Sequence, residues 1–124
     1  TYKVKYVHAA GGNKEMACAV VKLQQGEDIF VESAYGDGPV DSACRAIDRI
    51  TGMRGHLVDY RVSSVTRGKD ALGEVFVQVK FAERSYTGKA ASVDVIDASV
   101  RAYVNTVNKA VYEEKKEQER KLSK

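Results

Sequence analysis

The sequence has few of the residues that build metal, redox or disulfide sites. It contains 2 cysteines and 2 histidines in 124 residues, and neither His8 nor His56 lies near a second good metal ligand along the chain. The spacing of Cys18 and Cys44 matches neither a zinc site nor a redox pair, so we expect two buried free thiols in a reducing compartment. We therefore expect this domain to hold no metal ion and no cofactor.

A large charge of one sign and long apolar runs are also lacking. The 20 basic and 17 acidic residues leave a net charge of +3, which is no electrostatic footprint for nucleic acid or for a membrane surface. No apolar run approaches membrane-spanning length and no signal peptide is visible, so we expect a cytoplasmic protein. The sequence begins at Thr1 rather than at a methionine, and we expect it to come from a longer chain.

A catalytic set of nucleophile, base and orienting residue is lacking as well. Ser63 and Ser64 have no nucleophile turn and no adjacent base, so we expect no catalytic residue in this fragment. An RNA-binding module is an alternative function, because such modules also combine antiparallel strands with helices. The aromatic stacking signature of those modules is missing from the sequence.

An internal repeat organises what is present. At an offset of 56 residues, the segment Val40–Ala46 recurs as Ile96–Ala102, with an aspartate second and an arginine sixth in both copies. Without any gap, the same offset matches residues of the expected strands: Val4 with Tyr60, Gly12 with Gly68, Val21 with Val77 and Phe30 with Tyr86. The repeat predicts one domain over residues 1–124, built from two copies of one unit over about 1–55 and 56–112.

Each copy is predicted to hold three antiparallel strands followed by a helix, which is an α+β fold class. The expected strands run over 2–7, 16–23 and 29–34 in the first copy and over 58–62, 75–81 and 86–91 in the second. Period-2 alternation indicates half-buried strands, and the short turns make them antiparallel neighbours. It directs Tyr2, Val4 and Tyr6 inward in the first copy, and Val58, Tyr60 and Val62 in the second.

The two expected helices have apolar stripes at helical spacing. The first begins at Pro39 and ends near Gly52, and the stripe of the second reaches Val111. Residues 113–124 are then a charged helical extension or tail, in which Glu117 and Lys121 have the spacing of an ion pair.

The two helix starts differ in how their backbone amides are satisfied. Asp94 can cap the second helix with its own carboxylate, whereas Gly38, at the equivalent place in the first, has no side chain. The turn before the first helix, Gly36-Asp37-Gly38, offers no side-chain cap, so the amides of Val40 and Asp41 must donate to water or to an anion. A glycine turn capped by water and an anion-binding site both remain open on this evidence.

Several ordered motifs run through nearly the whole chain: Gly36-Asp37-Gly38-Pro39-Val40-Asp41-Ser42-Ala43, Leu57-x-x-Tyr60, Ser64-Val65-Thr66-x-Gly68-x-Asp70-Ala71-Leu72-Gly73-Glu74 and Thr87-Gly88-x-x-x-Ser92-x-Asp94-x-Ile96-Asp97-Ala98-Ser99. Together they resemble the C-terminal regulatory domain of 2-isopropylmalate synthase, which citramalate synthases share.

The resemblance implies a homodimeric, amino-acid-binding allosteric domain that acts in leucine biosynthesis by feedback inhibition. The parent enzyme would transfer an acetyl group from acetyl-CoA to 2-oxoisovalerate in a separate catalytic barrel, which would hold a divalent metal. L-Leucine is the expected effector, because the motif from Asp70 to Glu74 and the charged tail are closer to the isopropylmalate branch. The alternative is an isoleucine-binding domain of citramalate synthase.

The resemblance also implies where the effector lies, between the two units and near the dimer interface. The implied effector-binding positions are Gly36, Asp37, Gly38, Val40, Asp41, Leu57, Tyr60, Ser64, Val75, Val93 and Asp94. A free amino acid needs donors for its carboxylate, acceptors for its ammonium group and an apolar pocket. The amides of the glycine turn suit the first need, Asp37, Asp94 or turn carbonyls the second, and Val40, Leu57 and Tyr60 the third.

Overall fold

The computed structural model describes residues 1–12 and 15–123 of the chain. Along the sequence the elements are β1 (Tyr2–Gly12), β2 (Glu15–Gln25), β3 (Asp28–Gly36), α1 (Pro39–Thr51), β4 (Gly55–Arg67), β5 (Asp70–Phe81), β6 (Arg84–Ser92) and α2 (Val95–Leu122). The strands form two antiparallel sheets, β1-β2-β3 and β4-β5-β6. The α+β class and the duplication of a βββα unit are confirmed.

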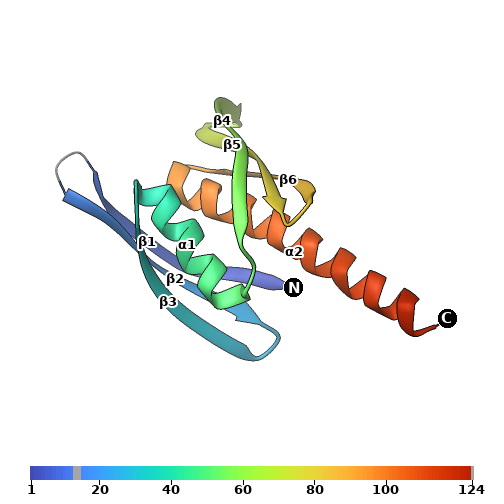
Figure 1. Cartoon of the computed structure of the whole chain (residues 1–124). Helices are drawn as coiled ribbons and strands as arrows, with labels where there is room; N and C mark the ends of the chain where they lie inside the picture. Colours follow the sequence, from blue (N-terminus) through green and yellow to red (C-terminus); the bar gives the residue numbers. More distant parts are fainter. Residues whose placement is uncertain (13–14, 124) are drawn as a thin grey trace.

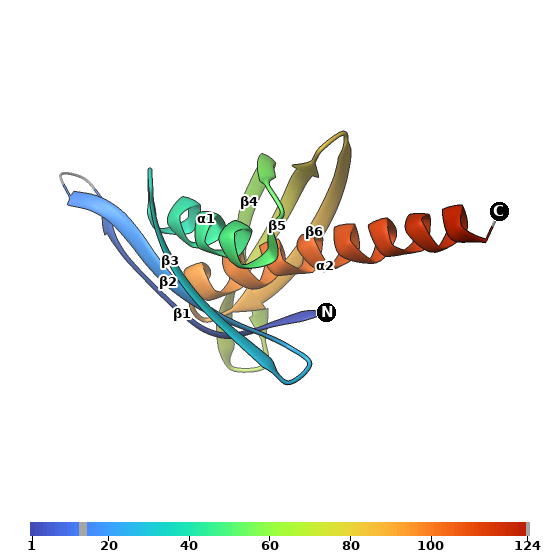
Figure 2. The same ribbon diagram turned by 60° about the horizontal axis from the view of Figure 1, so that its bottom comes forward.

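The two helices lie side by side between the two sheets and run in the same direction (Figures 1 and 2). Helix α1 packs against all three strands of the first sheet, and α2 packs against β5 and β6 of the second. Helix α2 also contacts α1 and β1. The two units therefore share one core instead of having one each.

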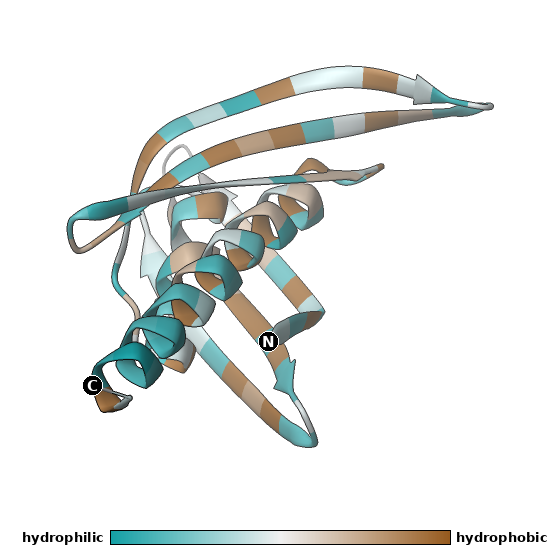
Figure 3. Ribbon diagram, turned by 90° about the vertical axis from the view of Figure 1, so that its right-hand side faces the viewer, coloured by the Kyte–Doolittle hydropathy of each residue, from teal (hydrophilic) through white to brown (hydrophobic). Residues whose placement is uncertain are grey.

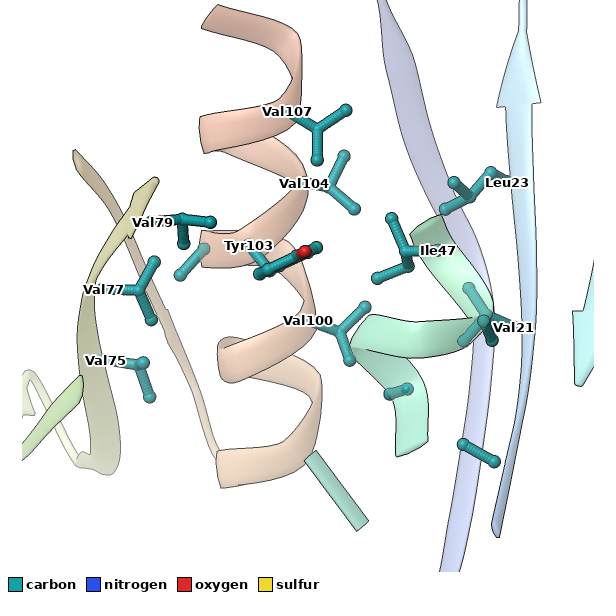
Figure 4. Packing of buried hydrophobic residues seen from close by; sticks show 14 of the residues in the cluster. Val21, Leu23, Ile47, Val75, Val77, Val79, Val100, Tyr103, Val104 and Val107 are labelled. Carbon is teal, nitrogen blue, oxygen red and sulfur yellow. The ribbon is translucent and has the colours of Figure 1, made fainter. Parts of the chain in front are cut away.

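The core is built from the inward face of each sheet and the stripes of both helices. Figure 4 shows the β5 side chains on one side of α2 and the α1 and β2 side chains on the other. The period-2 alternation predicted for β5 is confirmed, because Val75, Val77, Val79 and Phe81 are all buried. Leu23, Ile47 and Tyr103 are the largest fully buried side chains. This shared apolar core fixes the positions of the helix starts.

A β-bulge in each unit's first strand changes which side chains face inward. In β1, Val4 pairs with Leu23 but Tyr6 pairs with Lys22, so Lys5 is an extra residue. A bulge shifts the period-2 alternation by one residue beyond it. The predicted inward direction of Tyr6 is therefore wrong: its side chain is 53% exposed and Val7 takes its place.

The strand β4 has its bulge at the equivalent place. Leu57 pairs with Val79 and Asp59 pairs with Gln78, which makes Val58 the extra residue. The predicted inward direction of Val58 is wrong for the same reason, and its side chain is 53% exposed. Tyr60 lies beyond the bulge and does face the helices, as predicted.

The gapless register of the repeat is also wrong in these first strands. Val4 and Leu57 pair with Leu23 and Val79, which are themselves equivalent at the offset of 56. Leu57 is therefore the counterpart of Val4, at an offset of 53, and Tyr60 is not. The first hairpin differs in length between the two units, but β3 and β6, and likewise α1 and α2, begin 56 residues apart. The offset of 56 therefore holds for these later elements.

Two side chains in equivalent positions protect the outer edges of the two sheets. Arg49 on α1 donates to the Ser33 carbonyl of β3 at 2.7 Å, and Asn105 on α2 donates to the Lys89 carbonyl of β6 at 2.9 Å. Both donors and both acceptors are related by the offset of 56. Edge strands are prone to pair with other chains unless their backbone groups are covered, so these side chains serve the same purpose in both units.

The end of α2 is helical and strongly polar, as the teal turns at its C-terminal end in Figure 3 show. The predicted Glu117–Lys121 pair is not the one that forms, because Glu117 bonds to Arg84 at 3.0 Å across the β5–β6 turn. None of the helices in the described part of the chain has a stretch long and apolar enough to cross a membrane.

The two thiols are free, but only one of them is protected from water. Cys44 lies on α1 and is partly buried, whereas Cys18 is exposed on the outer face of β2. The prediction of two buried thiols is therefore wrong for Cys18. Its position follows from the alternation of β2, in which Ala17 and Ala19 face the core.

Candidate functional site

A groove of about 1030 Å³ runs along α1 and is closed on its other side by the beginning of β4. The residues that line it come from α1, the connection after it, β4 and the α2 residue Tyr103. The groove reflects an asymmetry of the repeat: β1 packs against both helices, whereas β4 packs extensively only against β5. An open space is thus present between α1 and β4, whereas the equivalent elements α2 and β1 are in contact.

The start of α1 opens on this groove without a side-chain cap. Gly38 is the N-cap residue and, within residues 1–12 and 15–123, no side chain accepts from the first amides of the helix. Pro39, with no N–H, follows at the first helical position. Val40 and Asp41, whose amides come next, both line the groove. This is the arrangement in which a helix start attracts an anion.

The start of α2 is closed by its own side chain, as predicted. The Asp94 carboxylate accepts from the amide of Ile96 at 2.9 Å and from that of Asp97 at 3.4 Å. Its Oδ1 atom therefore occupies the place where an external anion would bind. The two helix starts are equivalent in sequence position and opposite in chemistry.

The negative charge of Asp41 does not point freely into the groove. Its Oδ2 atom accepts from the Asp37 amide at 2.9 Å and from the Arg45 guanidinium at 3.0 Å. A Cβ atom on Gly36 would collide with that same oxygen, which explains the glycine at this position. Because Asp41 is paired on the turn, an anion at the helix start meets less repulsion than the sequence alone suggests.

One wall of the groove is apolar and carries a fixed aromatic ring. Val40 from α1 and Leu57 from β4 contribute aliphatic surface, and 41% of Leu57 is exposed. Tyr60 is partly buried, and its hydroxyl lies 2.6 Å from the Ser99 hydroxyl on α2. The ring is thereby held in place at the groove, so the wall is preorganised.

The floor of the groove contains a buried cluster of titratable groups. Burial raises the pKa of Asp48 to about 6, although hydrogen bonds from Tyr103 and Gly55 and the charges of Arg54 and Arg45 act to lower it. Burial and the Asp48 charge raise the pKa of the Tyr103 hydroxyl. Burial, followed by the charges of Asp48 and Asp41, raises the pKa of the Cys44 thiol. A protonated thiol is a poor nucleophile.

The structure brings four of the predicted effector-binding residues together in the groove, namely Val40, Asp41, Leu57 and Tyr60. The turn residues Gly36, Asp37 and Gly38 directly precede α1 at its open end. Ser64 lies further along β4 opposite Gly73, which packs against Val95 at the start of α2.

The remaining predicted positions lie away from the groove. Val93 is 78% exposed before α2, and the Asp94 carboxylate is engaged in its own helix cap. Val75 is fully buried beneath α2, so it does not line the groove in this arrangement. Among the described residues, no group of three or more His, Cys, Asp or Glu side chains is placed to hold a metal ion.

Sequence reasoning missed Asp48 and Ser99 as parts of the site. Asp48 lies in the last turn of α1, where the negative end of the helix dipole disfavours an acidic side chain. An aspartate at this unfavourable position was the feature of the sequence that could have indicated a functional role. Ser99 interrupts the α2 stripe with a hydroxyl, but its role depends on Tyr60, 39 residues away. No local pattern indicates such a distant partner.

The family model described as the LeuA allosteric (dimerisation) domain matches residues 1–111 of the chain. The chain belongs to this family. It is 52% identical over 112 residues to a 2-isopropylmalate synthase of Methylacidiphilum infernorum, an alignment that covers 90% of this chain and 22% of that relative.

Two further relatives show the same pattern. A 2-isopropylmalate synthase of Ruminiclostridium cellulolyticum is 46% identical over 82% of this chain and 20% of its own length. One of Pelotomaculum thermopropionicum is 41% identical over 94% of this chain and 23% of its own. The chain therefore spans about a fifth of the length of the curated relatives it matches, and it corresponds to their LeuA domain.

Proposed function

We propose that this chain is a feedback-regulatory domain that binds L-leucine in the groove between α1 and β4. The observation that carries the proposal is the uncapped start of α1, which opens on an apolar wall of Val40, Leu57 and Tyr60. A leucine molecule has one anionic end and one aliphatic end. The groove offers a partner of matching chemistry for each.

In this proposal the effector carboxylate accepts from the amides of Val40 and Asp41. The ammonium group then lies near the turn, where the Asp37 carboxylate and the turn carbonyls are the available acceptors. Asp48 cannot serve this purpose, because it lies seven residues along α1 from Asp41, a rise of about 10 Å at about 1.5 Å per residue. The two charged groups of an amino acid lie much closer together than that.

The domain would act as part of a homodimeric 2-isopropylmalate synthase in the cytoplasm. The catalytic part would use a divalent metal to transfer the acetyl group of acetyl-CoA to 2-oxoisovalerate. A ligand between two units of one subunit shifts their relative packing only as far as it binds one arrangement better than the other. The isolated chain is then expected to bind leucine and dimerise without showing inhibition.

Calorimetric titration of the chain with L-leucine tests the proposal directly. We expect binding of L-leucine, weaker binding of L-valine because about 1 kcal/mol is lost with one methylene, and no binding of leucinamide, which lacks the carboxylate. Absence of heat with L-leucine would refute the proposal. Tighter binding of L-isoleucine would instead favour the citramalate synthase branch, and salt-sensitive RNA binding would favour a nucleic-acid module.

A further inference from the structure

A single carboxylate of the first unit holds two elements of the second unit at the floor of the groove. Asp48 Oδ1 on α1 accepts from the Tyr103 hydroxyl on α2 at 2.6 Å. Asp48 Oδ2 accepts from the amide of Gly55, the first residue of β4, at 3.2 Å. We call these three groups the Asp48 junction, and all three residues line the groove.

The repeat provides an internal comparison for this junction. At the offset of 56 residues, Val104 is the counterpart of Asp48 and Ile47 is the counterpart of Tyr103. Ile47 and Val104 are 0% and 3% exposed and belong to the apolar core. At the equivalent place the fold has two buried apolar side chains, so packing does not require a carboxylate at position 48.

The glycine at position 55 also belongs to this arrangement. A Cβ atom there would collide with the Tyr103 hydroxyl and approach the Phe81 ring. The bare backbone lets the hydroxyl come close enough to reach Asp48. The missing side chain of Gly55 and the carboxylate of Asp48 thus both allow the hydrogen bond from Tyr103.

Ionised Asp48 is poorly solvated in this position. It lies at the negative end of the α1 dipole and is partly buried, and an ionised carboxylate there is disfavoured relative to its protonated form. The titratable and charged side chains that line the groove together with Asp48 are Asp41, Cys44, Arg45, Arg49, Arg54, His56, Tyr60 and Tyr103. The arginines oppose the effect of burial without cancelling it.

We propose that the Asp48 junction is a proton-dependent latch between the two units, favoured when the carboxyl is protonated and weakened when it ionises. A protonated carboxyl keeps both contacts, because its O–H donates to the Tyr103 hydroxyl while its carbonyl oxygen accepts from Gly55. No buried charge then remains. Since the junction lines the groove, the latch also sets the shape of the effector site, a consequence that rests on the proposed function.

The sign of the pH dependence follows from linkage. The pKa of Asp48 in the folded protein, about 6, is raised above its ordinary value. The stability that this group contributes is therefore complete below its unfolded pKa, at about pH 4, and is lost as the pH rises through the folded value. The latch is tight in mild acid and weaker at neutral pH.

The test compares the wild-type chain with Asp48→Asn, which keeps an acceptor and cannot ionise. The Tm of the wild type is expected to fall by several degrees relative to that of Asp48→Asn between about pH 5 and about pH 7.5. Exchange of the Gly55 amide, corrected for intrinsic rate, is expected to accelerate over the same range only in the wild type. Asp28→Asn, at the exposed first position of β3, serves as the matched control.

A carbon-13 titration of the Asp48 carboxyl in the wild type stands independently of whether the variant folds. Tyr103→Phe is expected to raise the pH of that titration, because it removes a donor to the ionised form. A titration at the ordinary aspartate value, or a Tm difference independent of pH, would overturn the latch. All these measurements are made without leucine, so failure of leucine to bind would refute the proposed function and leave the latch standing.

Discussion

The Tyr60 hydroxyl donates to the Ser99 hydroxyl oxygen across 2.6 Å. The direction of this bond follows from the donor count, since the one proton of Ser99 is already directed to the Val95 carbonyl at 2.7 Å. The ring of a strand residue is thus fixed by the first turns of α2. Through this bond the apolar wall of the groove depends on the position of α2.

Replacing Tyr60 with phenylalanine is expected to keep the apolar wall and release it from α2. The lost hydrogen bond should cost about 0.5–1.5 kcal/mol of stability, and a less ordered ring should weaken leucine binding by up to about fivefold, or about 1 kcal/mol. Urea unfolding and calorimetry measure the two effects. Tyr112→Phe on the exposed part of α2 is the control. Equal stability and equal leucine affinity of the two variants would contradict the role of the Tyr60–Ser99 hydrogen bond.

Gly38→Asp is expected to stabilise the chain and to abolish most of its leucine binding. Gly38 has φ −159° and ψ 177°, an extended conformation open to any residue. No heavy atom outside its sequence neighbours lies within 4 Å of a Cβ atom added there. The new carboxylate should cap α1 as Asp94 caps α2, with a gain of a few tenths of a kcal/mol, and should fill the anion site.

Gly38→Ala is the matched control for that change, because alanine adds a Cβ atom and leaves the amides unoccupied. Calorimetry is expected to show leucine binding close to that of the wild type for alanine and at least about tenfold weaker binding for aspartate. If both variants bind leucine equally well, the α1 start is not the carboxylate site.

Leu23→Ala is expected to destabilise the domain by about 2–5 kcal/mol, the range for removing a fully buried leucine side chain. Leu23 has 0% exposure and lies in the core shared by both units. Ile29→Ala on the outer face of β3, where 47% of the side chain is exposed, should change stability by less than about 0.5 kcal/mol. Chemical denaturation of both variants measures the difference. Similar losses of stability in the two variants would contradict the assignment of Leu23 to the core.

Gly88→Ala is expected to be among the most damaging single-methyl additions in the chain. A Cβ atom at Gly88 would overlap the backbone oxygen of Ala102 on α2, and backbone cannot move aside as a flexible side chain can. Overpacking of this kind costs about 1–3 kcal/mol. Thr87→Ala, at the neighbouring exposed position, is the control in thermal unfolding, and a Gly88→Ala variant as stable as that control would contradict the close approach of β6 to α2.

The element order, the repeat and the contrast between the helix starts were predictable because each depends on a local signal. Pro39 and Gly52 mark the ends of α1, and the apolar alternation of β5 identifies its inward face. Asp94 and Gly38 show their different capping chemistry in their own side chains. Such signals need no knowledge of distant parts of the chain.

The errors arose where a distant partner decides the outcome. The bulges at Lys5 and Val58 are visible only in the pairing with the next strand, so the inward directions predicted for Tyr6 and Val58 are wrong. The gapless register fails in the first strands because the first hairpin differs in length between the two units. The spacing on α2 predicts an ion pair between Glu117 and Lys121, but Glu117 pairs instead with Arg84 of β6. The groove itself results from the separation between β4 and the helices, and the spacing of apolar residues in the sequence does not predict that separation.

The first strand of the chain is fastened to the last helix. The Tyr2 amide donates to the Asn108 side chain at 2.7 Å, the Asn108 side chain donates back to the Tyr2 carbonyl at 2.9 Å, and the two residues are 106 positions apart. Strand β1 therefore reaches its final place only when α2 is present. Although the sequence consists of two similar halves, each half contributes to the core of the other, and this contact joins the first strand of one to the helix of the other.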